Sequence, residues 1–392
     1  MARDEAVLMV GKSAHDVLYY ASAHLAEALQ AAGRPCRIVR LGTPETDAQM
    51  NDAISNGRTL YFLGLNGMGS DLTTSGNVCA YEATGIPYFS LHADHPCYFT
   101  ARPSKESTYV TFVYFNLEHY RASRLISPPS AMRCLLPHFG GNPPDGTPRK
   151  LSERSNSYVF VQQGHSPEAQ RAVLQASPRV LRMIDDIVDA YAWKQKPVLE
   201  AVDERLAASG LLEGAHKTQL YWEVARWCDT LIRMKRATRL AQAIVELPGI
   251  FVGGSWDHLD RTRARARFVD PAPYPEVLAL IDDAQVTVNV LPNNDLMPHE
   301  RVANAMLRGS VAFTDGNTYL RNHFAGLYQE YTWDPDDIRE RLAGCLGRID
   351  TFQEMVESAR ERAIEVFDHR DLARRLEEIV DLWFLTRGRV TP

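Results

Sequence analysis

The stretch QVTVNVLPNNDLMPHERVANAMLRGSVAFTD, residues 285–315, decides the fold of this chain. It begins with an apolar, β-branched run at 285–292, continues as an amphipathic helix from residue 299 to Gly309, and ends in a second apolar run at 310–315. A strand, a helix and a strand in succession favour parallel pairing through a right-handed crossover. The stretch therefore predicts a doubly wound α/β domain.

The same alternation fills the first 120 residues and returns after residue 247. Runs rich in β-branched and aromatic residues indicate strands, and the apolar recurrence between them indicates amphipathic helices. We expect an α/β protein with two Rossmann-like domains that face a cleft, the default place for a ligand. The predicted strands cover 6–11, 36–42, 59–65, 86–92 and 109–115 in the first domain, and 249–256, 263–269, 285–292 and 310–315 in the second.

Between these two regions the sequence changes character. Residues 125–157 are rich in Pro, Gly and Ser, which is typical of a long surface segment or linker, and residues 167–246 are mostly helical. We therefore expect an N-terminal domain at 1–157, a mostly helical linker or insertion at 158–246, and a C-terminal domain with terminal helices at 247–392.

Composition narrows the function classes. A formal net charge of −6 gives no overall attraction to nucleic acid or to an anionic membrane, so any phosphate site must be local. The six cysteines form no C-x-x-C pair, which argues against a zinc site or a disulfide framework. No apolar run reaches the ~20 residues of a membrane span. We expect a cytoplasmic protein without a transmembrane segment or a nucleic-acid partner, and the oligomeric state stays open.

Three polar residues, His299, Glu300 and Arg301, open the helix that follows the strand at 285–292. In an open α/β sheet, ligands bind beyond the carboxyl ends of the strands, where helix N-termini present free N–H groups. Such a position favours a phosphate, to which His299 and Arg301 could add donors. Alternatively, Glu300 complements the helix dipole and His299 caps the helix or packs. The residues alone leave both interpretations open.

This helix start resembles the nucleotide-sugar-binding motif of GT-B glycosyltransferases. In the group typified by the O-GlcNAc transferases, a His opens a helix whose first turn holds the nucleotide diphosphate. An acidic residue five positions later binds the ribose, and a Gly closes the helix ten positions after the His. His299, Asn304 and Gly309 match these positions, which places Val302 in the first turn. The resemblance implies that these residues and Arg301 bind the donor.

The chain departs from that motif at two points. The carboxylate for the ribose is an amide at Asn304, and one end of an amide is a donor instead of an acceptor. The first glutamate of the E-x7-E motif of retaining enzymes falls at Leu296, so that motif is absent. We expect Glu300 to take over part of its catalytic role.

The sequence is also similar to the bacterial CgeB-like, or spore-maturation, glycosyltransferases of the group 1 type. In the carboxyl half the likeness rests on VNVLP, HERV, LRG and FTD, and in the amino half on GIPYFSLHADHP at 85–96. It is strongest over residues 59–120 and 249–330. By this resemblance, His92 follows the strand from which a histidine approaches the donor sugar in retaining enzymes.

Asp94 and His95 lie beside His92 at the end of a predicted strand. Glycosyl transfer needs stabilisation of an oxocarbenium-like transition state and a base for the acceptor hydroxyl. We expect Asp94 and His92 to be catalytic, with His95 near the acceptor or the sugar. The alternative is that the His and Asp side chains cap the next segment.

Two glycine-containing loops give weaker signals. GLNGMGSD (64–71) places Asn66 and Gly67 after a strand, where they could bind acceptor or sugar or form a tight turn. In GGSW (253–256), the resemblance puts Gly254 and Ser255 near the donor phosphates, and a turn is the alternative. The resemblance also gives the backbone of Phe268 and Val269 a contact with the nucleobase.

Two charged patterns remain. As a strand, RTRARAR (261–267) would place four arginines on one face, either to bind an anion or to form a solvated edge. Asp334 and Asp336 match the D-x-D of metal-dependent transferases, but their position at the start of a late helix favours a helix N-terminus rich in acids. We expect no metal site, and GT-B enzymes usually work without a bound divalent ion.

Together, these features predict a glycosyltransferase (EC 2.4, hexosyltransferase-like) with no cofactor besides its nucleotide-sugar co-substrate, a UDP-sugar by preference. The second domain would hold the donor, and the first a glycan, lipid or protein acceptor. The resemblance favours retention of configuration. Two alternatives stay open: a catalytically silent relative that acts as a nucleotide-sugar sensor or partner subunit, and a different reaction on this fold, such as sugar-nucleotide epimerisation.

Overall fold

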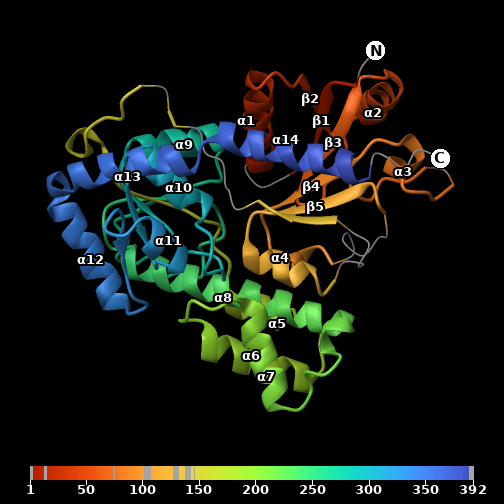
Figure 1. Ribbon diagram of the computed structural model, residues 1–392. Coiled ribbons are helices and arrows are strands. Elements are labelled where there is room, and N and C mark those ends of the chain that lie inside the picture. Colours follow the sequence, from red (N-terminus) through yellow and green to blue (C-terminus); the bar gives the residue numbers. More distant parts are fainter. Residues whose placement is uncertain are drawn as a thin grey trace. The chain divides into compact units, whose positions relative to one another are not determined.

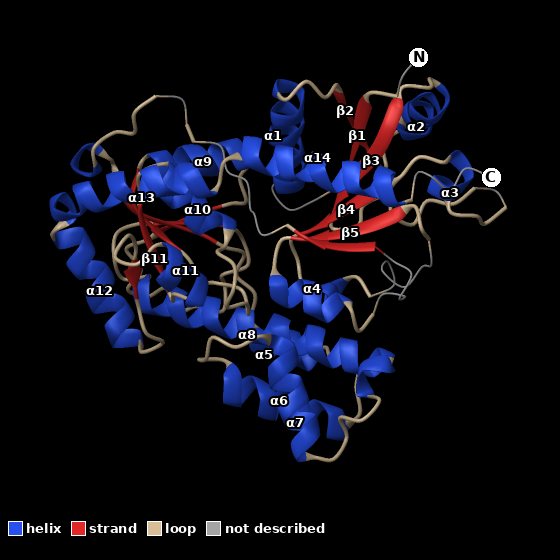
Figure 2. Cartoon of the chain, in the orientation of Figure 1, coloured by secondary structure: helices blue, strands red, loops and turns tan. Residues whose placement is uncertain are grey.

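The computed structural model describes residues 3–12, 16–74, 76–100, 107–126, 132–136, 143–144 and 146–387. The chain forms two compact units: unit 1 comprises residues 1–140 and 367–392, and unit 2 comprises residues 141–366. Each unit is built around a six-stranded sheet flanked by helices (Figures 1 and 2). The expected α/β class with two doubly wound domains is confirmed.

Unit 1 contains a parallel sheet in the order β2-β1-β3-β4-β5-β6. The order reverses at β1, which has β2 on one side and β3 on the other. The strands are β1 (Glu5–Val10), β2 (Cys36–Arg40), β3 (Thr59–Leu65), β4 (Tyr88–His92), β5 (Val110–Tyr114) and β6 (Met132–Leu135). Its helices include α1 (Val17–Ala31), α2 (Thr46–Ser55), α3 (Ala80–Thr84) and α4 (Leu117–Ser123).

The last helix, α14 (His369–Thr386), also belongs to unit 1 and packs against α1 (Figure 1). Its apolar face is buried, and Glu377 accepts hydrogen bonds from the Arg34 guanidinium and the Tyr61 hydroxyl, both at 2.7 Å. The C-terminal domain expected at 247–392 therefore lacks its final helix. Helical periodicity shows which face of α14 is buried but not which sheet that face covers.

Unit 2 contains a second parallel sheet, in the order β12-β11-β10-β7-β8-β9. Its strands are β7 (Asn156–Val161), β8 (Ile250–Val252), β9 (Arg267–Val269), β10 (Ala284–Val288), β11 (Val311–Thr314) and β12 (Gln329–Glu330). Its helices include α9 (Tyr274–Asp282), α10 (Glu300–Leu307), α11 (Thr318–His323), α12 (Pro335–Gly347) and α13 (Gln353–Val366).

The boundaries expected between domains differ from those observed. Strand β7 lies inside the second sheet, between β10 and β8, so this sheet begins before residue 158. The expected irregular segment at 125–157 contains β6 and lies partly outside the described residues. Neither β6 nor β7 was among the predicted strands, and their assignment to one sheet or the other depends on non-local pairing.

The helical block, residues 167–244, consists of α5 (Pro167–Ala172), α6 (Pro178–Tyr191), α7 (Val198–Ala208) and α8 (Gln219–Ile244). It belongs to unit 2 instead of linking two domains. The carboxyl end of α8 enters the core of that unit, where Leu240 and Ile244 are fully buried and the Ile244 carbonyl accepts a 2.9 Å hydrogen bond from Tyr158. The block is thus fixed to the sheet through α8.

Two glycines allow the aromatic core of unit 2 to approach the backbone. A Cβ at Gly249 would lie 2.3 Å from the Tyr158 ring, and one at Gly164 would lie 2.2 Å from the ring of Trp256. Trp256 is buried against Phe160 and Phe251. Close packing of this kind leaves no room for a methyl group, so it fixes the loop that follows β7. Across the described residues, no helix has both the length and the apolarity of a membrane span.

Candidate functional site

The carboxyl edge of the second sheet has a topological switch point between β7 and β10. From β7 the sheet extends through β8 to β9, and from β10 it extends through β11 to β12. Helix α10, which follows β10, places Arg301 against the end of β7. There its guanidinium donates to the Val161 carbonyl and, at 2.8 Å, to Oε1 of Gln162. The predicted helix start therefore lies where open α/β sheets bind ligands.

His299, Glu300, Arg301 and Gln162 form what we call the switch-point cluster. His299 is the N-cap of α10, with extended backbone angles. Its Nδ1 lies 2.6 Å from the Glu300 carboxylate, and its Nε2 lies 3.2 Å from Nη2 of Arg301. With its proton on Nδ1, the imidazole donates to Glu300 and accepts from the guanidinium at Nε2; with the proton on Nε2, Nδ1 accepts the cap hydrogen bond from the Arg301 N–H at 3.3 Å. The His299 imidazole thus lies between the Glu300 carboxylate and the Arg301 guanidinium and contacts both.

The charges of the cluster follow from its burial. Burial, and then the Arg301 charge, lower the pKa of His299 to about 4. Burial raises the pKa of Glu300, but the contacts with His299 and Arg301 lower it by a larger amount. The net result is a pKa of about 2. At neutral pH the imidazole is therefore uncharged, while the Glu300 carboxylate and the Arg301 guanidinium form an ion pair.

These contacts refine the expectation for the helix start. The cluster side chains bind one another and the end of β7, and the Glu300 carboxylate lies at the positive end of the α10 dipole. The structure confirms a helix start with His299 as its cap. Phosphate binding by His299 and Arg301 stays a prediction.

Asn304 lies one turn after Glu300 on the same face of α10. Its side chain is 6 % exposed, and its amide nitrogen donates a 2.8 Å hydrogen bond to the hydroxyl of Tyr274 at the start of α9. Burial and the nearby Glu300 charge raise the pKa of Tyr274 to about 12. The hydroxyl therefore stays protonated at neutral pH.

The side chain of Val302 is not presented to a ligand, and its part in donor binding stays a prediction. The side chain is fully buried, and its N–H donates to the His299 carbonyl at 3.0 Å inside the helix. An apolar residue in the first turn is needed to hold α10 against the sheet, and that packing determines its position.

The loop after β8 lies beside the loop after β7. Gly253 has φ of +131°, and a Cβ there would lie 2.3 Å from the Gln162 carbonyl oxygen. Gly254 donates a 2.9 Å hydrogen bond to the side chain of Gln163, and Ser255 holds a left-handed conformation with φ of 64°. The structure therefore brings the predicted donor residues Gly254 and Ser255 to the same sheet edge as the cluster.

Phe268 and Val269 lie on the edge strand β9, next to β8. The Phe268 ring packs against Phe251 at 4.8 Å, and the Val269 carbonyl accepts a 3.0 Å hydrogen bond from Gly253. Both residues share the sheet edge with the Gly253–Ser255 loop but are separated from β10 by β7 and β8. Their contact with a nucleobase stays a prediction.

The predicted row of four arginines on one strand face is wrong. Of the four, only Arg267 lies in β9, because the chain turns before it: Ala264 bonds back to Arg261, and both Arg265 and Ala266 donate to the Val245 carbonyl. The Arg261 guanidinium instead lies 4.0 Å from the centroid of the Phe268 ring. The alternation of Arg and other residues in the sequence is therefore not a strand.

A buried polar network at the ends of β10 and β11 was not predicted. Asp315 accepts a 2.9 Å hydrogen bond from the Leu291 N–H and another from the Gln195 side chain, and the buried Arg236 of α8 stabilises its charged form. Burial raises the pKa of Asp315 to about 6, although Arg236 opposes the shift. The only sequence signal was the Thr-Asp pair at the end of a strand.

In unit 1 the structure joins two predicted site residues. Asn66, after β3, donates a 2.8 Å hydrogen bond to the Asp94 carboxylate, and its carbonyl oxygen accepts from the backbone of Ala93 at 3.0 Å. Asn66 is buried with φ of 51°, whereas Asp94 is exposed. A rigid, buried amide thus orients an exposed carboxylate at the carboxyl edge of the first sheet.

His92, the second predicted catalytic residue, lies in the core of unit 1. Its side chain is 1 % exposed, its Nε2 is 2.8 Å from the Ser90 hydroxyl, and its ring stacks on Tyr114 at 5.0 Å. This burial does not leave the imidazole open to a sugar, so the expected contact with the donor is corrected to a packing role.

His95 and Gly67 have local structural roles, which were the alternatives to sugar binding. His95 caps a short 3-10 helix, Pro96–Tyr98, by accepting from the Cys97 N–H at 3.1 Å. Gly67 has φ of 75° in the turn after β3, and its carbonyl accepts from Ser70 at 3.0 Å. Both residues lie near Asn66 and Asp94 in sequence, and their contact with an acceptor is untested.

The D-x-D match belongs to a helix cap. Asp334 is the N-cap of α12 and accepts a 2.9 Å hydrogen bond from the Asp336 N–H. The interpretation as an acidic helix N-terminus is confirmed. Among the residues that the structure describes, no group of three or more His, Cys, Asp or Glu side chains is arranged to hold a metal ion.

Residues 233–381 match a family model described as glycosyl transferase-like. This matched region contains α10, with Arg301 and Asn304, and Asp315 after β11. No curated protein shows a significant match to the sequence.

Solved structures of glycosyltransferases superpose over nearly the whole chain. AviGT4, a glycosyltransferase involved in avilamycin A biosynthesis, is 12 % identical with a TM-score of 0.51, over 97 % of this chain and 98 % of that one. The β-glucosyltransferase of T4 phage is 11 % identical with a TM-score of 0.54, over 97 % and 99 %. HepE of Anabaena, in complex with UDP and glucose, is 10 % identical with a TM-score of 0.52, over 96 % and 99 %. These likenesses, with the two parallel sheets, show that the chain has the GT-B fold.

Proposed function

We propose that this protein is a glycosyltransferase that moves a sugar from a nucleoside diphosphate donor to an acceptor hydroxyl. One observation carries the proposal. The region that matches the glycosyl transferase-like family model contains the switch-point helix, α10, and this helix begins where doubly wound sheets bind ligands. The similarity of HERV and GIPYFSLHADHP to CgeB-like enzymes supports the same conclusion.

In this proposal the donor diphosphate binds at the N-terminus of α10, where the helix dipole stabilises the leaving group. Arg301 is held by Val161 and Gln162, so its charge is fixed behind that position without the need to reorganise. A phosphate and the Glu300 carboxylate repel each other at one helix end. Glu300 therefore turns from His299 towards a hydroxyl of the donor when the nucleotide binds.

This movement of Glu300 also explains the amide at position 304. Glu300 and Asn304 are four residues apart on one helix face, and the Asn304 amide nitrogen already donates to Tyr274. The carbonyl end of Asn304 then remains for a ribose hydroxyl. Glu300 supplies the carboxylate that related motifs carry one turn later.

On the acceptor side, Asp94 is the base. Its carboxylate is exposed, and Asn66 fixes it by a 2.8 Å hydrogen bond. An exposed carboxylate that an amide holds in place can accept the proton of an acceptor hydroxyl. The reaction would need no bound metal, since the α10 dipole and Arg301 neutralise the leaving diphosphate.

The first experiment is calorimetry with UDP, GDP, ADP and CMP. UDP is the first choice because HepE, with the same fold, was crystallised with UDP and glucose. Saturable binding of one nucleotide supports the donor site, and absence of binding to all four removes it. Transfer is then measured with a panel of nucleotide sugars and acceptors, and the anomeric configuration of the product decides between retention and inversion.

A second candidate is a catalytically silent nucleotide-sugar sensor. The observation that favours it is Asn304, which stands where related motifs have a carboxylate and is bonded to the Tyr274 hydroxyl. This candidate predicts nucleotide-sugar binding with neither hydrolysis nor transfer over hours. Turnover of any donor in the same panel excludes it.

A further inference from the structure

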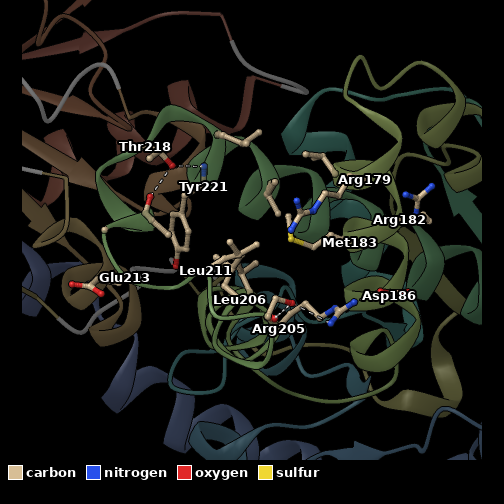
Figure 3. Close-up of a pocket in the computed structure, with 17 residues that line it drawn as sticks. Arg179, Arg182, Met183, Asp186, Arg205, Leu206, Leu211, Glu213, Thr218 and Tyr221 are labelled. Carbon is tan, nitrogen blue, oxygen red and sulfur yellow. Dashed lines mark hydrogen bonds and ion pairs between the residues drawn. The ribbon is translucent and has the colours of Figure 1, made fainter.

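A cavity of about 660 Å³ lies in the helical block, within unit 2. It is bounded by α6, by α7, by the turn that follows α7, and by the first turns of α8 (Figure 3). Its floor is apolar and fully packed: Val202, Leu206 and Val224 are buried. This volume falls within the roughly 300–1,000 Å³ of small-molecule sites. The cavity shares no lining residue with the switch-point cluster.

Exposed apolar side chains continue the cavity to the surface. Leu211 and Leu220 line it and are 45 % and 47 % exposed. Met183 lines the opposite wall, and a thioether side chain adapts its shape to an apolar ligand. Large leucines that stay exposed at the mouth of an apolar cavity indicate a surface that a ligand covers.

The charges at the mouth are asymmetric. Arg179 and Arg182 are three residues apart on α6, so they lie on one side of that helix, and both are exposed. Within the described part of the chain, the structure records no carboxylate partner for either guanidinium. Arg205, the third arginine at the cavity, is already paired with Asp186. Two unpaired guanidinium groups beside an apolar cavity favour an anion.

The opposite wall of the cavity carries a negative charge. Glu213 lies on the same side of the cavity as Leu211 and Tyr221, across from Arg179 and Met183 (Figure 3). An anionic head group is therefore attracted to the α6 wall and repelled from the far wall. This gives the cavity a direction, with the head at Arg179 and Arg182 and the tail towards Leu211 and Leu220.

We propose that this cavity binds a single-chain amphiphile with an anionic head, such as an alkyl phosphate or a fatty carboxylate. The alkyl chain fills the apolar space between α6, α7 and α8, and Arg179 and Arg182 bind the head. The proposal is independent of the donor site, so nucleotide binding can fail while amphiphile binding succeeds, and the reverse.

The test is calorimetry of the full chain with decyl phosphate below its critical micelle concentration. The expected result is saturable binding of one molecule per chain, with affinity that falls roughly tenfold in octyl phosphate, which lacks two methylenes. Decyl maltoside, with the same tail and a neutral head, should bind at least tenfold more weakly. Decanoate, which keeps the charge with a different head, should stay close to decyl phosphate.

Three variants locate the ligand. Arg179→Glu combined with Arg182→Glu should weaken decyl phosphate at least tenfold, because the head then meets two carboxylates. Ser209→Trp, at an exposed position that lines the cavity, should block the tail without altering the core. Arg226→Glu is the matched control: it is exposed on α8, lies outside the cavity and should leave binding unchanged. Circular dichroism and the melting temperature confirm that each variant folds.

Several results would overturn the proposal. One is the absence of saturable binding of decyl phosphate, and another is equal binding of decyl maltoside. A third is unchanged affinity in a folded Ser209→Trp chain, which would place the ligand elsewhere. Capture of the chain by anionic vesicles without binding of monomeric decyl phosphate would assign this face to a membrane surface instead. Titration of UDP into the Ser209→Trp variant tests whether the amphiphile site and the donor site are separate, and unchanged UDP binding in this variant shows that they are.

Discussion

Arg301 donates a 2.8 Å hydrogen bond to Oε1 of Gln162, which lies 139 residues earlier in the chain. This contact joins the first turn of α10 to the end of β7 across the switch point of the second sheet. Because the same guanidinium also binds the Val161 carbonyl and His299, it holds the candidate donor site in one geometry. Preorganised charge of this kind is what stabilises a leaving diphosphate.

The first prediction concerns this cluster. Arg301→Ala or His299→Ala should weaken binding of the accepted nucleotide more than tenfold, because each change removes part of the ordered first turn of α10. Calorimetry measures the effect. Arg321→Ala is the control and should change the affinity less than twofold. It removes an exposed arginine on the neighbouring helix α11, which is paired with Glu330. Unchanged affinity in a folded Arg301→Ala chain would contradict the assignment.

The second prediction concerns stability in acid. The pKa of His299 is lowered to about 4, from 6.5 in the unfolded chain, so the unfolded state binds more protons between these values. The stability linked to a neutral His299 is therefore complete above pH 6.5 and is lost as the pH falls towards 4. The largest loss is about 3 kcal/mol.

The variant His299→Asn keeps a capping side chain without a titratable group. Between pH 6.5 and 4.5, the urea midpoint of the wild type should therefore fall more than that of His299→Asn. Parallel pH profiles for the two chains would show that burial does not hold the imidazole neutral.

The third prediction is a pH dependence of stability opposite in direction to that of His299. The pKa of Asp315 is raised from 3.8 to about 6, so the native state keeps a proton that the unfolded state releases between these values. Its contribution to stability therefore decreases as the pH rises from about 4 to 6. Asp315→Asn should gain stability relative to the wild type over this range, by up to about 3 kcal/mol. Urea unfolding at pH 4.5 and pH 7 measures it, and an equal difference at both values would exclude the raised pKa.

The fourth prediction tests the base. Asp94→Asn should lower the rate of transfer at least a hundredfold while the nucleotide affinity changes less than twofold, because Asp94 lies in unit 1 and the donor cluster lies in unit 2. Asp47→Asn, at an exposed position on α2, is the control and should keep full activity. Full activity in Asp94→Asn would remove this residue from the mechanism.

The same base should depend on its hydrogen-bond partner. Asn66→Ala removes the amide that orients Asp94, so kcat should fall with little change in KM for the donor. A loss of fold in this variant, detected by circular dichroism, would assign Asn66 a structural role first.

The fifth prediction tests the packing below the site. Gly164→Ala places a methyl group about where the Trp256 ring lies, because the nearest ring atom is 2.2 Å from that position. The free energy of unfolding should fall by about 1–3 kcal/mol. Gly347→Ala is the control: it has open space around it at the end of α12 and should be neutral or slightly stabilising. Equal stability of the two variants would contradict the close packing.

Much of the fold could be predicted because it depends on local patterns. The strands that became β1, β3, β4, β5 and β10 were located within a few residues by their apolar runs. The start of α10 was located by its polar first turn, with His299 as the N-cap. These signals are local because side-chain burial repeats with the period of each element.

The site could be predicted only in part. The sequence placed Asp94 and Asn66 at strand ends, but not the hydrogen bond between them. It predicted a sugar contact for His92, which packs on Tyr114 instead, and it missed the network of Asp315 with Gln195 and Arg236. A buried polar group must find a partner, and that partner is set by packing between elements distant in sequence.

The sequence by itself determined the α/β class, most of the strands of both sheets and the polar helix start at His299, because these follow from periodicity and capping along the chain. Only the tertiary structure decided that α14 returns to unit 1, that Asn304 binds Tyr274, and that Arg301 binds the end of β7. Each of these joins segments far apart in the chain, and burial selects the pairing that satisfies both partners.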